Sequence, residues 1–397
     1  MDQPQRVDTT RGAMALALLA NLLVACESSH KPIGSSRLIL GSGNGSILVR
    51  SPDGTVSRDA SLRLTIDPLP AIDTDGFLLP LVSPNGTHLA WQSQSTADWP
   101  TLLAQPDSTK HLQATVSGRP LNESGTWTQT EMLLLGRMAT DKGVLVESPR
   151  SDGSRWIGMV PWDGSTPRWL VQGEHVNAFA ALGPRGELAW CRRNPMQAEF
   201  GLVIERPEGR LEWPRREGES WLMPVVTPDG VYACSLRDGI LELVFLPLAA
   251  GQSLTTSQAE PALLRNRISM RGSPRAAFQT FAACSADRSG TRAGLLFFHP
   301  ELRRMVLWNP FKESMIALAP ESVSAWIQPD GSALLTLKDR LVMQEIPPEP
   351  GMVPLHMIPG LWIVRGRDAN GFILIGPADP KQCLVSRLRL GDKQTLP

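Results

Sequence analysis

The chain has 397 residues, with 39 basic and 39 acidic side chains and a formal net charge of zero. Without an excess of positive charge it has no general attraction to nucleic acid, which argues against a DNA- or RNA-binding protein. Glycine and proline occur 34 times each without a collagen-like period, a composition typical of many short elements separated by turns.

Residues 1–25 have the features of an export signal. Arg6 and Arg11 precede an apolar run over residues 13–25, which is shorter than the roughly 20 residues that a membrane-spanning helix needs. The run ends in Leu-Val-Ala-Cys, which resembles the lipobox of bacterial lipoproteins. This resemblance implies cleavage before Cys26, acylation of its thiol and a polar tether over residues 26–36. An ordinary cleaved signal of a secreted protein, or a buried apolar helix with an incidental cysteine, are the alternatives.

A turn followed by an apolar strand recurs along the rest of the chain. Proline sets φ at the second turn position, Asp or Asn suits the third, and glycine takes the conformation that returns the chain. Each turn is therefore expected to join two adjacent antiparallel strands. The four copies are Ser83-Pro84-Asn85-Gly86, Gly183-Pro184-Arg185-Gly186, Thr227-Pro228-Asp229-Gly230 and Gln328-Pro329-Asp330-Gly331.

A second hairpin belongs to the same repeating unit. Residues 156–161 lead through Trp162-Asp163-Gly164-Ser165 into residues 166–170, and weaker copies occur at 202–209 and 47–54. With the first turn, this pattern resembles the WD40-like or TolB-type β-propeller repeat. The resemblance covers much of residues 77–390 and implies an all-β propeller of four-stranded blades; it says little about function, because such propellers serve many purposes.

Units of roughly 45 residues predict seven blades, with six or eight as alternatives. The expected boundaries are 77–118, 119–171, 172–217, 218–258, 275–319, 320–358 and 359–390, within a single domain over residues 37–397. The last unit has room for only three strands, so we expect the strand-rich segment 37–64 to supply the fourth and close the ring. Residues 249–276 do not fit the repeat and are predicted to form an inserted loop.

Two groups of residues are candidates for ligand binding. Trp162 and Trp169 flank a hairpin turn, where an exposed indole suits a sugar face, whereas Trp91 and Trp190 repeat in Leu-Ala-Trp triplets and are predicted to be core. The inserted loop carries basic side chains without an intervening acid, which suits an anionic partner or lipid headgroups. These side chains include Arg265, Arg267 and Arg271. A plain mobile loop and ordinary core tryptophans are the competing interpretations.

No catalytic constellation is recognisable. There is no G-x-S-x-G nucleophile elbow, no paired-histidine zinc motif and no CxxC pair, so neither a cofactor nor a metal site is predicted. Cys191 and Cys234 follow similar turns and are expected at equivalent strand positions, as buried thiols.

The sequence therefore favours a binding or scaffolding platform over an enzyme. We expect a monomer or a subunit of an envelope assembly, tethered to a membrane outside the cytoplasm and binding an envelope protein or polysaccharide. Glu27 after the cysteine, in place of the aspartate that retains such proteins at the inner membrane, favours the outer membrane. A propeller-fold lyase or glycoside hydrolase, using carboxylates on face loops, is the alternative.

Overall fold

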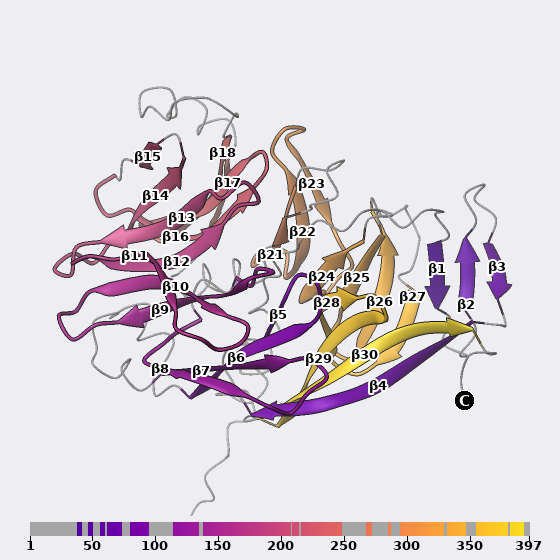
Figure 1. The fold of residues 1–397 in the computed structure, drawn as a ribbon. Coiled ribbons are helices and arrows are strands. Elements are labelled where there is room, and N and C mark those ends of the chain that lie inside the picture. The colour runs from indigo at the N-terminus through magenta and orange to yellow at the C-terminus, as the bar shows by residue number, and fades with distance from the viewer. Residues whose placement is uncertain are drawn as a thin grey trace, which may run out of the picture.

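The structure is a computed structural model of the whole chain. It describes residues 38–41, 47–50, 56–59, 62–73, 80–94, 114–134, 138–207, 209–213, 216–247, 267–271, 285–286, 294–328, 332–346, 355–379 and 382–392. All the regular elements in these ranges are β-strands (Figure 1). No helix among them has the length and apolar character required to cross a bilayer.

Five sheets have four strands each, which run in order across the sheet, as in the blades of a propeller. The first comprises β5 Leu81–Val82, β6 His88–Gln94, β7 Thr115–Pro120 and β8 Trp127–Thr130. The next two comprise β16 Ser220–Thr227, β17 Gly230–Arg237, β18 Ile240–Pro247 and β19 Arg267–Arg271, then β20 Ser285–Ala286, β21 Leu295–His299, β22 Arg304–Asn309 and β23 Ser314–Ala317. The last two comprise β24 Ser324–Ile327, β25 Ser332–Thr336, β26 Arg340–Glu345 and β27 Leu355–Pro359, then β28 Ile363–Asp368, β29 Gly371–Asp379, β30 Gln382–Asp392 and β4 Leu62–Asp73.

A seven-stranded sheet lies between the first and second of these in the chain. It contains β9 Gly143–Pro149, β10 Arg155–Pro161 and β11 Arg168–Val171, then β12 Val176–Leu182, β13 Leu188–Arg193, β14 Gly201–Arg206 and β15 Gly209–Glu212. The two groups are joined by a single parallel pair, Arg155 with Val176. Before β9, isolated bridges from Leu133 and Ala139 run along its other edge. Five blades are therefore present as separate four-stranded sheets, and a total of seven blades remains a prediction.

The N-terminal part of the chain closes the ring, but not with the segment expected. The closing strand is β4, which pairs antiparallel with β30 along nearly its whole length (Figure 1). The segment predicted to close the ring, residues 37–64, overlaps β4 by only three residues. Most of that segment instead forms a separate three-stranded sheet beside β27, made of β1 Leu38–Gly41, β2 Ile47–Arg50 and β3 Val56–Asp59. β4 contains Pro68 and Pro70, which it tolerates because it is the outer strand of its sheet.

Buried apolar side chains connect the sheets into a ring. One cluster runs from the first sheet through the seven-stranded sheet to the sheets of β16–β19 and β20–β23. A second joins the sheets of β20–β23 and β24–β27, a third joins β24–β27 to the last sheet, and a fourth joins the last sheet to the first. The first strands of neighbouring sheets also contact one another, as β12 contacts β16 and β28 contacts β5. The chain is therefore an all-β β-propeller, as predicted.

Two of the three fully described turns have the expected geometry, whereas Gly230 of the third has no positive φ and pairs with Thr227 across a two-residue turn. Gly86 and Gly186 both have positive φ, at 71° and 90°, and their N–H groups donate to the carbonyls of Ser83 and Gly183. The second hairpin is also confirmed, because β10 pairs with β11 and β14 with β15 around the predicted turns. The first blade extends to residue 130 instead of 118, and β19 lies inside the segment predicted as a loop.

Buried polar side chains of the second strand in one unit bind the backbone of the first strand in the next. Gln92 accepts the N–H of Leu134 at 3.1 Å, and Glu147 accepts the N–H of Phe179 at 2.6 Å. Phe179 and Met223 both have positive φ at a β-bulge, which turns their N–H groups away from the ladder. Met223 accordingly donates to Cys191. These contacts satisfy donors that the bulges would otherwise leave buried without a partner.

The cysteines at the bulges occupy equivalent positions, as predicted. Cys191 pairs with Ala178 and Cys234 with Leu222, in each case the residue just before the register shift. Both are buried thiols. Burial raises the pKa of Cys191 well above its usual range, and the nearby negative charge of Glu147 raises it further. Cys383 is likewise a buried thiol in β30.

Candidate functional site

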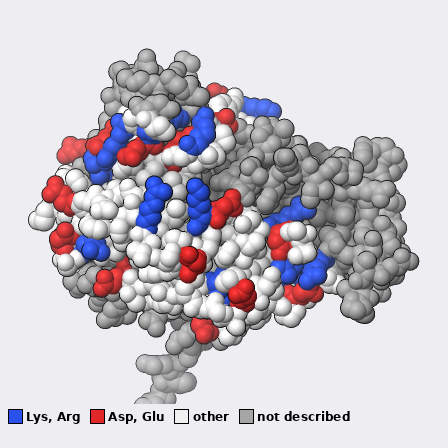
Figure 2. Space-filling view, viewed as in Figure 1, with Lys and Arg blue, Asp and Glu red and all other residues white. Residues whose placement is uncertain are grey.

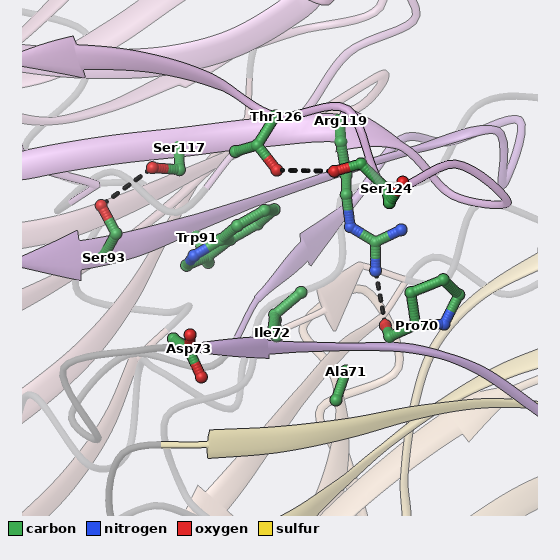
Figure 3. Close-up of a pocket in the computed structure, with 10 residues that line it drawn as sticks. All are labelled: Pro70, Ala71, Ile72, Asp73, Trp91, Ser93, Ser117, Arg119, Ser124 and Thr126. Carbon is green, nitrogen blue, oxygen red and sulfur yellow. Dashed lines mark hydrogen bonds between the residues drawn. The ribbon is translucent and has the colours of Figure 1, made fainter.

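The seam where the last blade meets the first contains a cavity of about 300 Å³. One wall is the end of β4, and the other is formed by β6, β7 and the turn before β8 (Figure 3). Its floor is buried and its rim is exposed. The lining residues are Pro70, Ala71, Ile72, Asp73, Trp91, Ser93, Ser117, Arg119, Ser124 and Thr126.

Strand alternation places the lining side chains on one face. Trp91 and Ser93 are two residues apart on β6, and Ser117 and Arg119 are two apart on β7, so each pair points to the same side of the sheet. Trp91 lies directly opposite Ser117 in the register of the two strands. Ring closure then brings β4 over this face, and residues far apart in the chain come to share one cavity.

Arg119 forms one wall of the cavity and also holds the seam. Its Nη2 donates to the carbonyl of Pro70 on β4 at 2.5 Å, and its Nη1 donates to the carbonyls of Leu121, at 3.2 Å, and Glu123. No carboxylate among the described residues pairs with it, and burial lowers its pKa. The guanidinium is therefore largely occupied by backbone oxygens and contributes shape more than a free charge.

Hydroxyl groups line the floor beside the indole. Ser117 Oγ donates to Ser93 Oγ at 2.9 Å and lies 3.2 Å from Thr128 Oγ1. At the rim, Thr126 donates to the carbonyl of Ser124 at 3.3 Å (Figure 3). These hydroxyls keep unused lone pairs that can accept hydrogen bonds from a guest molecule.

Trp91 brings an unused donor to the cavity. The residue is 5% exposed, and its indole N–H donates to no acceptor within the described part of the chain. The comparison is Trp190, the equivalent residue of the other Leu-Ala-Trp triplet, whose Nε1 donates to Asn177 at 3.0 Å. Both tryptophans are buried, as predicted, but only Trp91 has an N–H left for a ligand.

The tryptophans predicted to bind ligand lie elsewhere. Trp162 is 7% exposed, its Nε1 donates to the carbonyl of Thr140 at 2.8 Å, and its ring stacks on His88 with centroids 5.2 Å apart. Trp169 is half-buried and meets Trp156 edge-on at 5.6 Å. Neither lines the seam cavity, and a ligand role for either remains a prediction.

The predicted basic residues are only partly described. Arg271 is exposed at the end of β19, where its backbone N–H donates to Glu301 at 3.0 Å. Arg265, the side chain of Arg267 and Cys26 lie outside the described residues. Basic and acidic side chains are interspersed on the face shown in Figure 2, in keeping with the balanced composition.

The seam cavity was missed because its parts carry no sequence signal of their own. Ser93 and Ser117 are ordinary strand residues, and Trp91 is indistinguishable from a core tryptophan in the pattern. No group of three or more metal-ligating side chains occurs in the ranges that the structure describes.

No protein-family model matches the chain. No curated protein matches it either. Among solved structures it is similar to TolB from Acinetobacter baumannii, at 11% identity over 83% of this chain and 98% of that one, with a TM-score of 0.36.

Two other solved structures are similar at comparable levels. They are the Dos1 propeller (8% identity, 93% and 96% covered, TM-score 0.42) and the propeller domain of the Trilobed protease from Pyrococcus furiosus (11%, 81% and 95%, 0.44). At these identities the likeness concerns the fold alone. The chain is an all-β β-propeller, structurally similar to TolB-type and protease propellers.

Proposed function

We propose that this chain is an extracytoplasmic β-propeller that is anchored to a membrane through acylated Cys26 and binds an envelope protein or polysaccharide. The observation that carries the binding role is the seam cavity, whose buried floor presents hydroxyls and an unused indole N–H. Small-molecule sites commonly combine such a concave, partly apolar floor with a few polar groups.

The anchoring part of the proposal is supported by the N-terminal sequence. The apolar run before Cys26 suits a signal peptide, and the residues after it are polar enough to act as a tether. Each buried methylene of an acyl chain contributes about 0.8 kcal/mol, so several chains on one cysteine hold a protein firmly at a membrane.

The anchor is tested by Cys26→Ala in cells supplied with a labelled fatty acid. We expect the natural chain to carry the label and to fractionate with membranes, and the variant to lose both properties or accumulate as an unprocessed precursor. Ser28→Ala, two residues away, serves as the control and should behave like the natural chain. A Cys26→Ala protein that is processed and retained at the membrane would refute lipidation, and an unlabelled natural chain released from cells would favour the secreted alternative.

The binding role is tested separately with the purified chain from which residues 1–25 have been removed. We expect it to sediment with isolated cell-wall polysaccharide, or to crosslink to a defined envelope protein in intact cells. Failure of both measurements, with the protein folded, would contradict the platform role.

The enzymatic alternative requires a general acid with a raised pKa. Asp152 and Asp163 have clear shifts, and hydrogen bonds from Ser154 and Ser165 in exposed turns lower the pKa of each. These two carboxylates therefore do not supply that acid.

A further inference from the structure

The unused polar groups of the seam cavity match a particular class of ligand. Its floor combines the Trp91 N–H with the hydroxyls of Ser93 and Ser117, and its rim adds the carboxylate of Asp73. Asp73 is exposed, and among the described residues it accepts one hydrogen bond, from the amide of Gln382 at 3.4 Å, so it retains acceptor capacity. Ser117 donates its proton to Ser93, and Ser93 donates to the carbonyl of Thr115 at 3.1 Å, so the cavity offers one free donor, hydroxyl oxygens that can accept, and one strong acceptor.

An apolar or an anionic guest fits this arrangement poorly. An apolar guest would leave the indole N–H without a partner in a water-poor site, which is costly. An anionic guest would meet the Asp73 carboxylate at the rim, and Arg119 cannot compensate, since its guanidinium donates to backbone carbonyls on both sides of the seam.

A neutral molecule with several hydroxyl groups satisfies the same atoms. One sugar hydroxyl can accept from the indole N–H, and others can donate to Asp73 or to the serine oxygens. The size agrees, because about 300 Å³ is at the small end of the range for ligand pockets, roughly 300–1,000 Å³. Ile72, buried beside Trp91, adds an apolar surface for the C–H face of a ring.

We propose that the seam cavity between β4 and β6–β7 binds a neutral sugar unit, with Trp91 donating to a sugar hydroxyl and Asp73 accepting from one. This inference deepens the binding role proposed above by naming the ligand class. It does not depend on the membrane anchor. The sugar is either a free monosaccharide or the terminal unit of a glycan, since the two present the same hydroxyl chemistry.

The probes are glucose, N-acetylglucosamine and their β-1,4-linked dimers cellobiose and chitobiose, with binding followed by saturation-transfer NMR. We expect saturation of the ring protons of at least one probe and competition among those that bind. Saturation confined to one ring of a dimer that binds more tightly than its monomer would identify a glycan end. Equal or tighter binding of the monomer would identify a free sugar.

Two variants and a matched control test the residues. Trp91→Phe keeps an aromatic side chain but removes the N–H, and we expect about tenfold weaker binding, equivalent to about 1.4 kcal/mol. Asp73→Asn changes only an exposed rim group and should also weaken binding while the melting temperature stays unchanged. Trp190→Phe removes an indole N–H that is already bound to Asn177, so it should bind sugar like the natural chain.

Three outcomes would overturn the inference. The first is no saturation of any probe at millimolar concentration; the second is equal loss in Trp91→Phe and Trp190→Phe; the third is tighter binding of trialanine or inorganic phosphate at the same cavity. Polysaccharide or protein binding that persists in Trp91→Phe and Asp73→Asn would preserve the platform role and remove only this site from it.

Discussion

Replacing Gly86 by alanine should weaken the seam specifically, because the glycine does two things there. Its φ of 71° is a conformation that costs an alanine about 1–2 kcal/mol. A Cβ at this position would also lie 2.7 Å from the carbonyl oxygen of Arg367 and 2.8 Å from Cβ of Asp368, both in the last blade. Relieving such an overlap by backbone movement typically costs about 1–3 kcal/mol more.

Gly186 provides the control, because it occupies the equivalent turn with φ of 90° and a Cβ there would meet no atom within 4 Å. Gly186→Ala should therefore lose only the conformational part, about 1–2 kcal/mol, against about 2–5 kcal/mol for Gly86→Ala. Urea unfolding followed by tryptophan fluorescence measures both as a fall in the midpoint. Equal destabilisation of the two variants would show that the close approach across the seam does not limit the side chain at Gly86.

Three further predictions concern charge and titration. Arg387 is buried and donates to Asp368 at 2.6 Å, so Arg387→Met should lower the free energy of unfolding by about 3–5 kcal/mol. Arg389 pairs with Asp67 at the surface, so Arg389→Met should lower it by only about 0–1 kcal/mol. Similar losses for the two variants in urea unfolding would contradict this. Cys191, with its raised pKa, should resist iodoacetamide in the folded chain and react after unfolding; mass-spectrometric detection of rapid native labelling would refute it. Burial lowers the pKa of His88 below 6.5, so its contribution to stability is full above that pH and is lost as the pH falls; His88→Gln should flatten the dependence of the urea midpoint on pH, and an unchanged slope would count against this.

Local patterns along the chain predicted the units of the fold well. The Pro-x-Gly turns identified the strand pairs on either side of them, because a proline and a positive-φ glycine constrain the backbone regardless of what packs against it. The bulges at Phe179 and Met223 were not predicted, since neither residue type indicates a positive φ.

The seam could not be predicted because it depends on contacts between distant segments. β4 contains Pro68 and Pro70, which argue for a loop until the strand is known to lie at a sheet edge. Arg119 looks like a surface residue in the sequence, yet it is buried and binds the carbonyl of Pro70. Trp91 was correctly predicted as core, but its unpaired N–H becomes visible only when the neighbouring side chains are in place.

The pairing of β4 with β30 has a consequence for how the chain is made. Gln382 and Asp73, which meet across these strands, are 309 residues apart, so β4 cannot pair until β30 has been synthesised. Contacts this distant slow folding, and an unpaired edge in the meantime is a target for proteases and for other chains. Loss of β30 should therefore release β4, near the beginning of the domain, as well as the domain's last strand.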